Sequence, residues 1–182
     1  MNRPSTDSDR NPAVMKGGPV RVLGIDPGTY HLGVGVVDYD DETRHVYSTI
    51  VSPMRSKNLP DRLAHLYESL NDVAARWSPD EMAIEQPFAA KNVSAAMAIG
   101  HAQAIAMLVA AQRQMPTTTY APRQIKQAVT DYGGSSKEQV REMVAVMLDK
   151  HDELESSDES DALAVALCHI HAIQASDLVF LD

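Results

Sequence analysis

The feature that most constrains the fold is a pair of apolar, β-branched runs near the start of the chain. Residues 20–26 read VRVLGID and residues 32–38 read LGVGVVD, with only the five residues PGTYH between them. A link this short cannot hold a crossover helix, so we expect the two runs to pair as antiparallel strands. A third run at residues 44–51 follows the acidic turn DYDDET and extends the pattern to a three-stranded meander.

The rest of the chain alternates between helical and strand patterns. Leucines at helical spacing predict a helix over residues 59–76, and the short apolar run EMAIE predicts a buried strand. The further expected elements are a long helix at residues 92–113, a strand at TTTYAP, and helices at residues 122–130, 136–149 and 158–174. A meander followed by two helix-linked strands predicts an α/β fold with a mixed five-stranded sheet flanked by helices.

Length and composition limit the class of protein. The chain has 182 residues, of which 44% are hydrophobic and 23% charged, as in a single globular domain with a substantial core. It has no apolar stretch near the roughly 20 residues that span a bilayer and no secretory signal, so we expect a cytoplasmic protein without a membrane partner. Residues 1–18 are expected to be a disordered tail before a domain at residues 19–182. The lone cysteine, Cys168, is expected to be a core thiol.

Acidic residues stand at the ends of two expected strands and at the start of the last helix. Asp26 ends the first apolar run, and Glu85 ends EMAIE. If these strands are parallel neighbours, both carboxylates emerge at the carboxyl edge of the sheet, where open α/β sheets bind ligands. Asp158 and Asp161 are three residues apart and share a helix face. Carboxylates that converge on one point repel each other unless a divalent cation neutralises them, so the pattern predicts a site for Mg²⁺ or Mn²⁺.

Each acid also has an ordinary structural explanation. An Asp before a Pro-Gly pair is a common turn residue, and Glu85 alone would be a surface strand end. Ser156 and Glu159 fit a capping box. Asp158 and Asp161 near a helix start are favoured by the helix dipole. The joint occurrence of the acids places a metal site on an equal footing with these explanations.

Four segments of the chain read VLGIDPGTYHLGVGVV, AIEQPFAAKNVSAAMAIGHAQA, YAPRQIKQAVTDYGGSSKEQV and SDESDALAVALCHIHA. In order and spacing they resemble the RuvC-type Holliday junction resolvases, and the likeness spans residues 20–174. The resemblance implies a ribonuclease H-like fold and a homodimeric crossover junction endodeoxyribonuclease that acts on four-way junction DNA in recombination and repair. It also implies a branch-migration helicase complex as a partner.

The resemblance assigns roles to individual residues. The residues it implies for catalysis are Asp26, Glu85, Asp158, Asp161 and Lys137. The four acids among them would bind two Mg²⁺ or Mn²⁺ ions per active site. The residues expected to contact DNA are Phe88, as a base-stacking ring, with Lys91, Asn92, Arg123, Lys126 and Lys137. The expected chemistry is two-metal hydrolysis at symmetric positions in two strands, leaving 5′-phosphate and 3′-hydroxyl ends.

The chain departs from the family pattern at two places that lower positive charge. It has GHAQA at residues 100–104 where the family often has Gly-Gln-Ala-Arg-Gly, and Asp131 where a Gly commonly follows AVT. The formal net charge is −9, the wrong sign for binding phosphates. Residues 86–141 nevertheless carry six basic against two acidic side chains, whereas residues 1–85 sum to −4 and residues 142–182 to −9. Positive charge is therefore expected to concentrate in the middle of the chain.

Three questions stay open at this level. The Ala- and Met-rich helix at residues 92–113 either forms the dimer interface or packs on its own sheet. The string GIDPGT also resembles the first phosphate loop of actin-like and sugar-kinase ATPases, which need a second such domain that 182 residues cannot hold. A non-catalytic junction-binding module on the same fold is the other alternative. The four acids argue against it, because their repulsion at an empty site would have no use.

Overall fold

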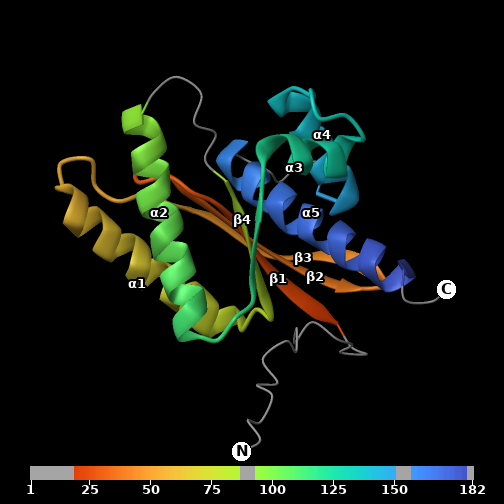
Figure 1. The fold of residues 1–182 in the computed structure, drawn as a ribbon, viewed down its shortest axis with the longest axis horizontal. Helices are drawn as coiled ribbons and strands as arrows, with labels where there is room; N and C mark the ends of the chain where they lie inside the picture. The colour runs from red at the N-terminus through yellow and green to blue at the C-terminus, as the bar shows by residue number, and fades with distance from the viewer. Residues whose placement is uncertain (1–18, 87–92, 151–156, 180–182) are drawn as a thin grey trace, which may run out of the picture.

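The elements follow one another in the predicted order. The computed structural model describes residues 19–86, 93–150 and 157–179. Within them lie β1 (Val20–Asp26), β2 (Leu32–Asp40), β3 (Glu42–Val51), α1 (Leu59–Trp77), β4 (Glu81–Glu85), α2 (Val93–Gln112), β5 (Thr117–Tyr120), α3 (Pro122–Thr130), α4 (Lys137–Met147) and α5 (Ser157–Val179) (Figure 1). The predicted tail at residues 1–18 lies outside the described residues.

Most boundaries lie within two residues of the prediction, and the differences at the β2–β3 hairpin and at the end of α5 have structural explanations or consequences. The hairpin of β2 and β3 extends further than expected, because Asp41 takes a left-handed φ of 63° that lets Asp40 pair directly with Glu42. The helix α5 continues to Val179, five residues beyond the predicted end at residue 174. Neither difference moves the elements that carry the predicted site.

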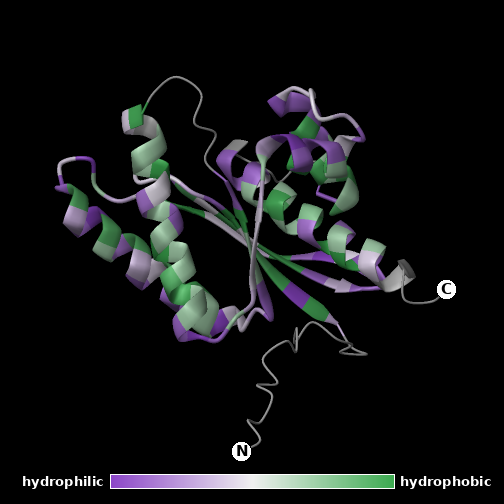
Figure 2. Cartoon of the chain, viewed as in Figure 1, coloured by the Kyte–Doolittle hydropathy of each residue, from purple (hydrophilic) through white to green (hydrophobic). Residues whose placement is uncertain are grey.

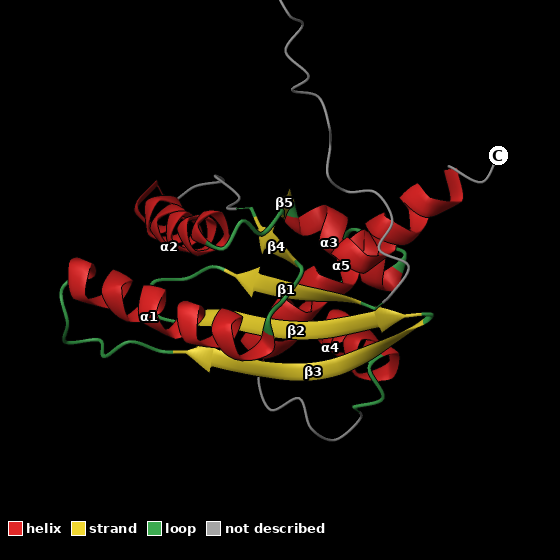
Figure 3. Ribbon diagram, turned by 90° about the horizontal axis from the view of Figure 1, so that it is seen from below, coloured by secondary structure: helices red, strands yellow, loops and turns green. Residues whose placement is uncertain are grey.

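The sheet is mixed, as predicted. Its strand order is β3-β2-β1-β4-β5, which Figure 3 shows with the strands side by side. The strands β1, β2 and β3 form the antiparallel meander, whereas β4 pairs parallel with both β1 and β5. Ile25 is the partner of Ile84, so Asp26 and Glu85 end neighbouring parallel strands. The predicted meeting of these two acids at one sheet edge is confirmed.

Helices cover both faces of the sheet and create two cores. Leu23 and Ile25 of β1 pack with residues of α1 and α2 on one face. Val22 packs with residues of α3, α4 and α5 on the other, because successive strand residues point to opposite faces. Cys168 lies in this second core, as predicted, and burial raises the pKa of its thiol to about 11. Within the described parts of the chain, every helix is too short or too polar to span a lipid bilayer.

A row of glycines lets α5 lie unusually close to the sheet. A Cβ at Gly24 would overlap the backbone oxygen of Ala162, and one at Gly33 would overlap that of Asp158. At Gly35 a Cβ would come within 2.9 Å of the backbone nitrogen of Leu163. The first two turns of α5 are therefore pressed against β1 and β2, and this contact places the acids of α5 near the end of β1.

Asp131, one of the two departures from the family pattern, ends α3 in a left-handed conformation with a φ of 57°. Glycine adopts this conformation without a steric cost, which explains why the family often has Gly there. We therefore expect Asp131→Gly to raise the free energy of unfolding by about 0.5–1 kcal/mol and Asp131→Ala to lower it. Urea unfolding of both variants tests this order. A Gly variant less stable than the parent protein would contradict it.

Candidate active site

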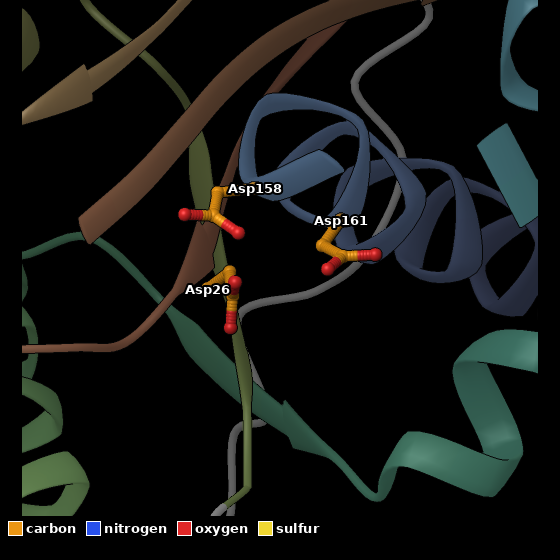
Figure 4. A group of neighbouring side chains, drawn as sticks. All are labelled: Asp26, Asp158 and Asp161. Carbon is orange, nitrogen blue, oxygen red and sulfur yellow. The ribbon is translucent and has the colours of Figure 1, made fainter. Parts of the chain in front are cut away.

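Three aspartates meet where β1 ends and α5 begins. Asp26 is the last residue of β1, and Asp158 and Asp161 lie in the first turns of α5 (Figure 4). Each offers one carboxylate oxygen, and these oxygens lie within 4.8 Å of one another. Oxygen ligands at this spacing, on half-buried side chains held by rigid elements, suit a hard divalent cation. The arrangement could hold a metal ion.

Glu85 completes the acidic cluster from the side of β4. It lines a cleft of about 170 Å³ together with Asp26 and Asp161. Burial raises the pKa of Asp26 to about 8, and the nearby charges of Glu85 and Asp161 add to the effect. Burial and the charge of Asp161 also raise the pKa of Glu85. Without a cation the site therefore opposes full ionisation of its own carboxylates, which is typical of a functional rather than a structural cluster.

Two of the three lysines that were predicted to contact DNA, Lys126 and Lys137, border this cleft. Lys137 begins α4, and its Nζ donates a hydrogen bond to Asp161 Oδ2 at 2.8 Å while 64% of the side chain stays exposed. Lys126 of α3 donates from Nζ to the backbone oxygen of Ser135 at 2.5 Å. Two positive groups thus lie at the edge of the acidic cluster, where they can meet a phosphate that approaches the cleft.

Of the other four residues predicted to bind DNA, the structure describes only Arg123. Phe88, Lys91 and Asn92 lie outside the described residues. Arg123 is exposed on the first turn of α3, and its side chain lies against Gly133, where an added Cβ would come within 2.6 Å of Arg123 Cγ. Arg123 does not line the cleft. Its contact with DNA stays a prediction.

Hydrogen bonds that sequence reasoning missed anchor α5 to the sheet. His169 lies in the interior, with Nδ1 2.7 Å from the Tyr120 hydroxyl and Nε2 2.9 Å from Glu81 Oε2. Nearer the acids, Ser48 Oγ donates to the carboxylate of Glu159. These bonds join α5 to β3, β4 and β5 and so help to fix the acids of α5 relative to Asp26. The apolar pattern CHIHA contains no signal that predicts a polar partner for His169.

The raised pKa of Asp26 predicts how stability depends on pH. Because this pKa is about 8 in the folded protein and about 3.9 in an unfolded chain, folding disfavours the ionised carboxylate. The resulting loss of stability grows as the pH rises from about 4 to about 8. We therefore expect Asp26→Asn, in EDTA, to raise the free energy of unfolding by about 1–3 kcal/mol at pH 8, allowing for solvent screening, and to have no effect at pH 4.

Urea unfolding at both pH values tests this expectation. The matched control is Asp72→Asn, which removes an exposed acid from α1 and should change stability little at either pH. An Asp26→Asn protein less stable than the parent at pH 8 would show that the carboxylate is not destabilised in the fold.

Three features together define a ribonuclease H-like protein of the nuclease type. They are the mixed sheet with this strand order, the helices on both of its faces, and the carboxylates at the ends of β1 and β4 and at the start of α5. The family model described as crossover junction endodeoxyribonuclease RuvC matches residues 22–169. The chain therefore belongs to the RuvC family of crossover junction endodeoxyribonucleases. The predicted family, fold and enzyme class are confirmed.

Individual relatives support the same assignment. A crossover junction endodeoxyribonuclease RuvC of Dehalococcoides mccartyi is 45% identical over 151 residues, which cover 82% of this chain and 92% of that protein. One of Syntrophotalea carbinolica is 39% identical and covers 88% and 99%. The structure of Thermus thermophilus RuvC in complex with a Holliday junction substrate matches with a TM-score of 0.80 at 30% identity, covering 86% of this chain and 96% of that one. The nucleotide-binding interpretation of GIDPGT is therefore set aside.

Proposed function

We propose that this protein resolves four-way DNA junctions during recombination and repair by cutting two strands at symmetric positions. The observation that carries the proposal is the acidic cluster at the end of β1 in a chain of this family. The Thermus thermophilus relative, with which the chain shares its fold, is described in complex with a Holliday junction substrate. The family resemblance also supports a branch-migration helicase complex as a partner at the junction.

The mechanism follows from the groups that meet at the end of β1. Asp26, with Glu85, Asp158 and Asp161 around it, would hold two Mg²⁺ or Mn²⁺ ions, because carboxylates on rigid elements are the donors these cations prefer. Bound ions of this kind activate water for attack on phosphorus and stabilise the leaving oxygen. Lys137, already paired with Asp161, would hold or polarise the attacked phosphate.

The other proposed DNA contacts serve to position the substrate. Lys126 would orient the phosphodiester backbone from the side of α3, and Phe88 would stack on an unpaired base at the point where strands exchange. Attack of water on phosphorus, with the 3′ oxygen as the leaving group, would form no covalent enzyme intermediate and would leave 5′-phosphate and 3′-hydroxyl ends.

A cleavage assay tests the proposed function. Purified protein is incubated with a labelled synthetic four-way junction, or with linear duplex of matched sequence, in Mg²⁺, Mn²⁺ or EDTA. Denaturing gels should show paired nicks at symmetric positions in the junction alone, and only with a divalent ion. An uncut junction that still shifts on a native gel would support the non-catalytic binding module instead.

The homodimer is proposed to form through the outer face of α2. One face of this helix packs on α1 and the sheet through Ala102, Ala106 and Val109. The opposite face carries exposed apolar residues, namely Val93, Met97, Met107 and Leu108. Figure 2 shows α2 as predominantly hydrophobic, and Gly100, where an added Cβ would meet nothing within 4 Å, leaves room for a second helix. An exposed apolar stripe of this kind is typical of an interface, and a two-fold dimer would present two equivalent sites to two equivalent strands.

We expect Met97→Glu to weaken this dimer, because two-fold symmetry places two new charges in one apolar contact. The dissociation constant should rise by about tenfold or more, and paired cuts should give way to single nicks. Sedimentation equilibrium measures the change. Met54→Glu is the control, since Met54 is similarly exposed but lies in the loop before α1. A parent protein that is monomeric at assay concentration would contradict the paired-cut model.

A further inference from the structure

A second group of positive side chains lies beside the acidic cluster, on the side away from α3 and α4. It consists of Arg55 and Lys57 in the loop before α1 and Arg62 in the first turns of that helix, and we call it the Arg55–Arg62 cluster. The ring of Tyr30, from the link between β1 and β2, lies beneath two of them. Its centroid is 4.0 Å from Arg62 Cζ and 5.8 Å from Arg55 Cζ, and 43% of the residue is exposed.

The arginines are held in place by groups that carry no negative charge. Arg55 Nη2 lies 3.3 Å from His31 Nε2, and His31 Nδ1 in turn lies 3.0 Å from Ser52 Oγ. Arg62 Nη1 donates to the backbone oxygen of Lys57 at 3.4 Å. The guanidinium groups are thus oriented by a ring, an imidazole and a carbonyl, and their charge stays uncompensated.

No described carboxylate forms an ion pair with the Arg55–Arg62 cluster. The ion pairs found among residues 19–86, 93–150 and 157–179 join other groups, as in the pair of Arg21 with Asp38. In residues 52–62 three basic side chains stand against the single acid Asp61. Arg62 Nε is buried and has no hydrogen-bond partner among the described residues. Positive charge that is oriented but not neutralised is suited to an anion from outside the chain.

The cluster lies at the same sheet edge as the acids. Tyr30 follows Asp26 by four residues, so it lies within about 14 Å of it. Val51, the last residue of β3, pairs with Leu32, the first residue of β2, and the loop with Arg55 and Lys57 therefore starts at this edge. Figure 1 shows the loop that leads into α1 on the left and α3 and α4 on the right. The acidic cluster lies between two positive flanks.

We infer that the Arg55–Arg62 cluster binds the backbone phosphates of one duplex arm of the junction, on the opposite side of the cleavage site from Lys126 and Lys137. The inference rests on the proposed function and adds a DNA contact to it. A chain with a net charge of −9 repels DNA as a whole, so its affinity must come from local positive surfaces. Two flanks that each hold an arm would centre the strand exchange point over the acids.

A salt titration of junction binding tests this inference. The double substitution Arg55→Gln and Lys57→Gln is made in the Asp26→Asn protein, so that binding is measured without cutting. The slope of log K against log salt is negative, and each lost phosphate contact makes it less steep by about 0.9. We therefore expect the steepness to decrease by about 1–2 and affinity to fall about tenfold at 0.1 M salt. Native gels at 50–200 mM salt, a range over which such contacts weaken measurably, give the slope.

The matched control is Arg44→Gln with Arg76→Gln, which removes the same charge from two exposed arginines. Arg44 lies near the start of β3 and Arg76 in the last turn of α1, both away from the acidic edge. The salt slope of this control variant should equal that of the Asp26→Asn parent. Equal salt slopes for all three proteins would overturn the inference. An equally reduced steepness in both double variants would also overturn it, because the change in net charge alone would then explain the effect.

Failure of the proposed function is distinguishable from failure of the inference. If the wild-type protein neither cuts nor binds the junction, the proposed function falls and the inference falls with it. If the Asp26→Asn parent binds the junction with a normal salt slope and the Arg55 and Lys57 substitutions leave it unchanged, only the inference is overturned. Thermal unfolding of the variants completes the test, because a purely structural role of the cluster would lower the melting temperature and leave the salt slope intact.

Discussion

Replacing Asp26 by Asn is expected to lower the rate of junction cleavage by about 10³-fold or more while the protein still binds the junction. The neighbours of Asp26 include Glu85 on β4 as well as both aspartates of α5, and an amide in its place removes a charge at the centre of the cluster. Burst or single-turnover cleavage with Mg²⁺ and with Mn²⁺ measures the loss, and a native gel measures binding.

Two comparisons make the outcome specific to the metal site. Asp72→Asn removes an exposed acid on α1 and should cut at the parental rate, since Asp72 lies on a helix outside the cleft. In a Mn²⁺ titration monitored by thermal unfolding, the parent should gain about 2–3 kcal/mol at a hundredfold excess over the dissociation constant, and the Asp26→Asn protein should gain much less. A fully active Asp26→Asn protein would show that the reacting phosphate lies elsewhere.

The substitution Gly33→Ala, which changes no charged or polar side chain, is expected to lower cleavage by about 10²-fold, the cost of displacing a catalytic group by about 1 Å. An added Cβ would overlap the backbone oxygen of Asp158 and come within 3.2 Å of Asp26 Cβ. Neither neighbour is the end of a flexible side chain, so the start of α5 must move away from β1. The carboxylates would then separate, and the affinity for Mn²⁺ should fall together with the rate.

The comparison variant is Gly35→Ala on the same strand. Its Cβ would meet the Leu163 side chain and backbone nitrogen at 2.9 Å, more than one turn of α5 beyond Asp158 and two residues beyond Asp161. Both substitutions should lower the free energy of unfolding by about 1–3 kcal/mol through overpacking, but only Gly33→Ala should lower Mn²⁺ affinity strongly. Equal metal affinity in the two variants would show that the close contact of α5 serves stability and not the geometry of the site.

Much of the fold was predictable because it depends on local patterns. Apolar alternation, turn residues and a five-residue link are enough to identify the meander of β1, β2 and β3, and the acids at strand ends follow from the same patterns. The hairpin end at Asp41 was missed because a left-handed non-glycine residue has no clear sequence signal. Phe88, Lys91 and Asn92 lie outside the described residues, so their predicted roles stay untested.

The elements, their order and the position of each acid within its element can therefore be predicted from the amino-acid sequence, since they depend on periods of two and 3.6 residues along the chain. The distances between elements depend instead on how the elements pack in three dimensions. The glycines beneath α5 set how near Asp158 comes to Asp26, and the packing of α4 beside α5 pairs Lys137 with Asp161. Tertiary packing also gathers Arg55 and Arg62 around Tyr30 in a half of the chain whose summed charge is negative. The physical reason is that charge and volume act through space, and a linear pattern does not specify which surfaces face each other.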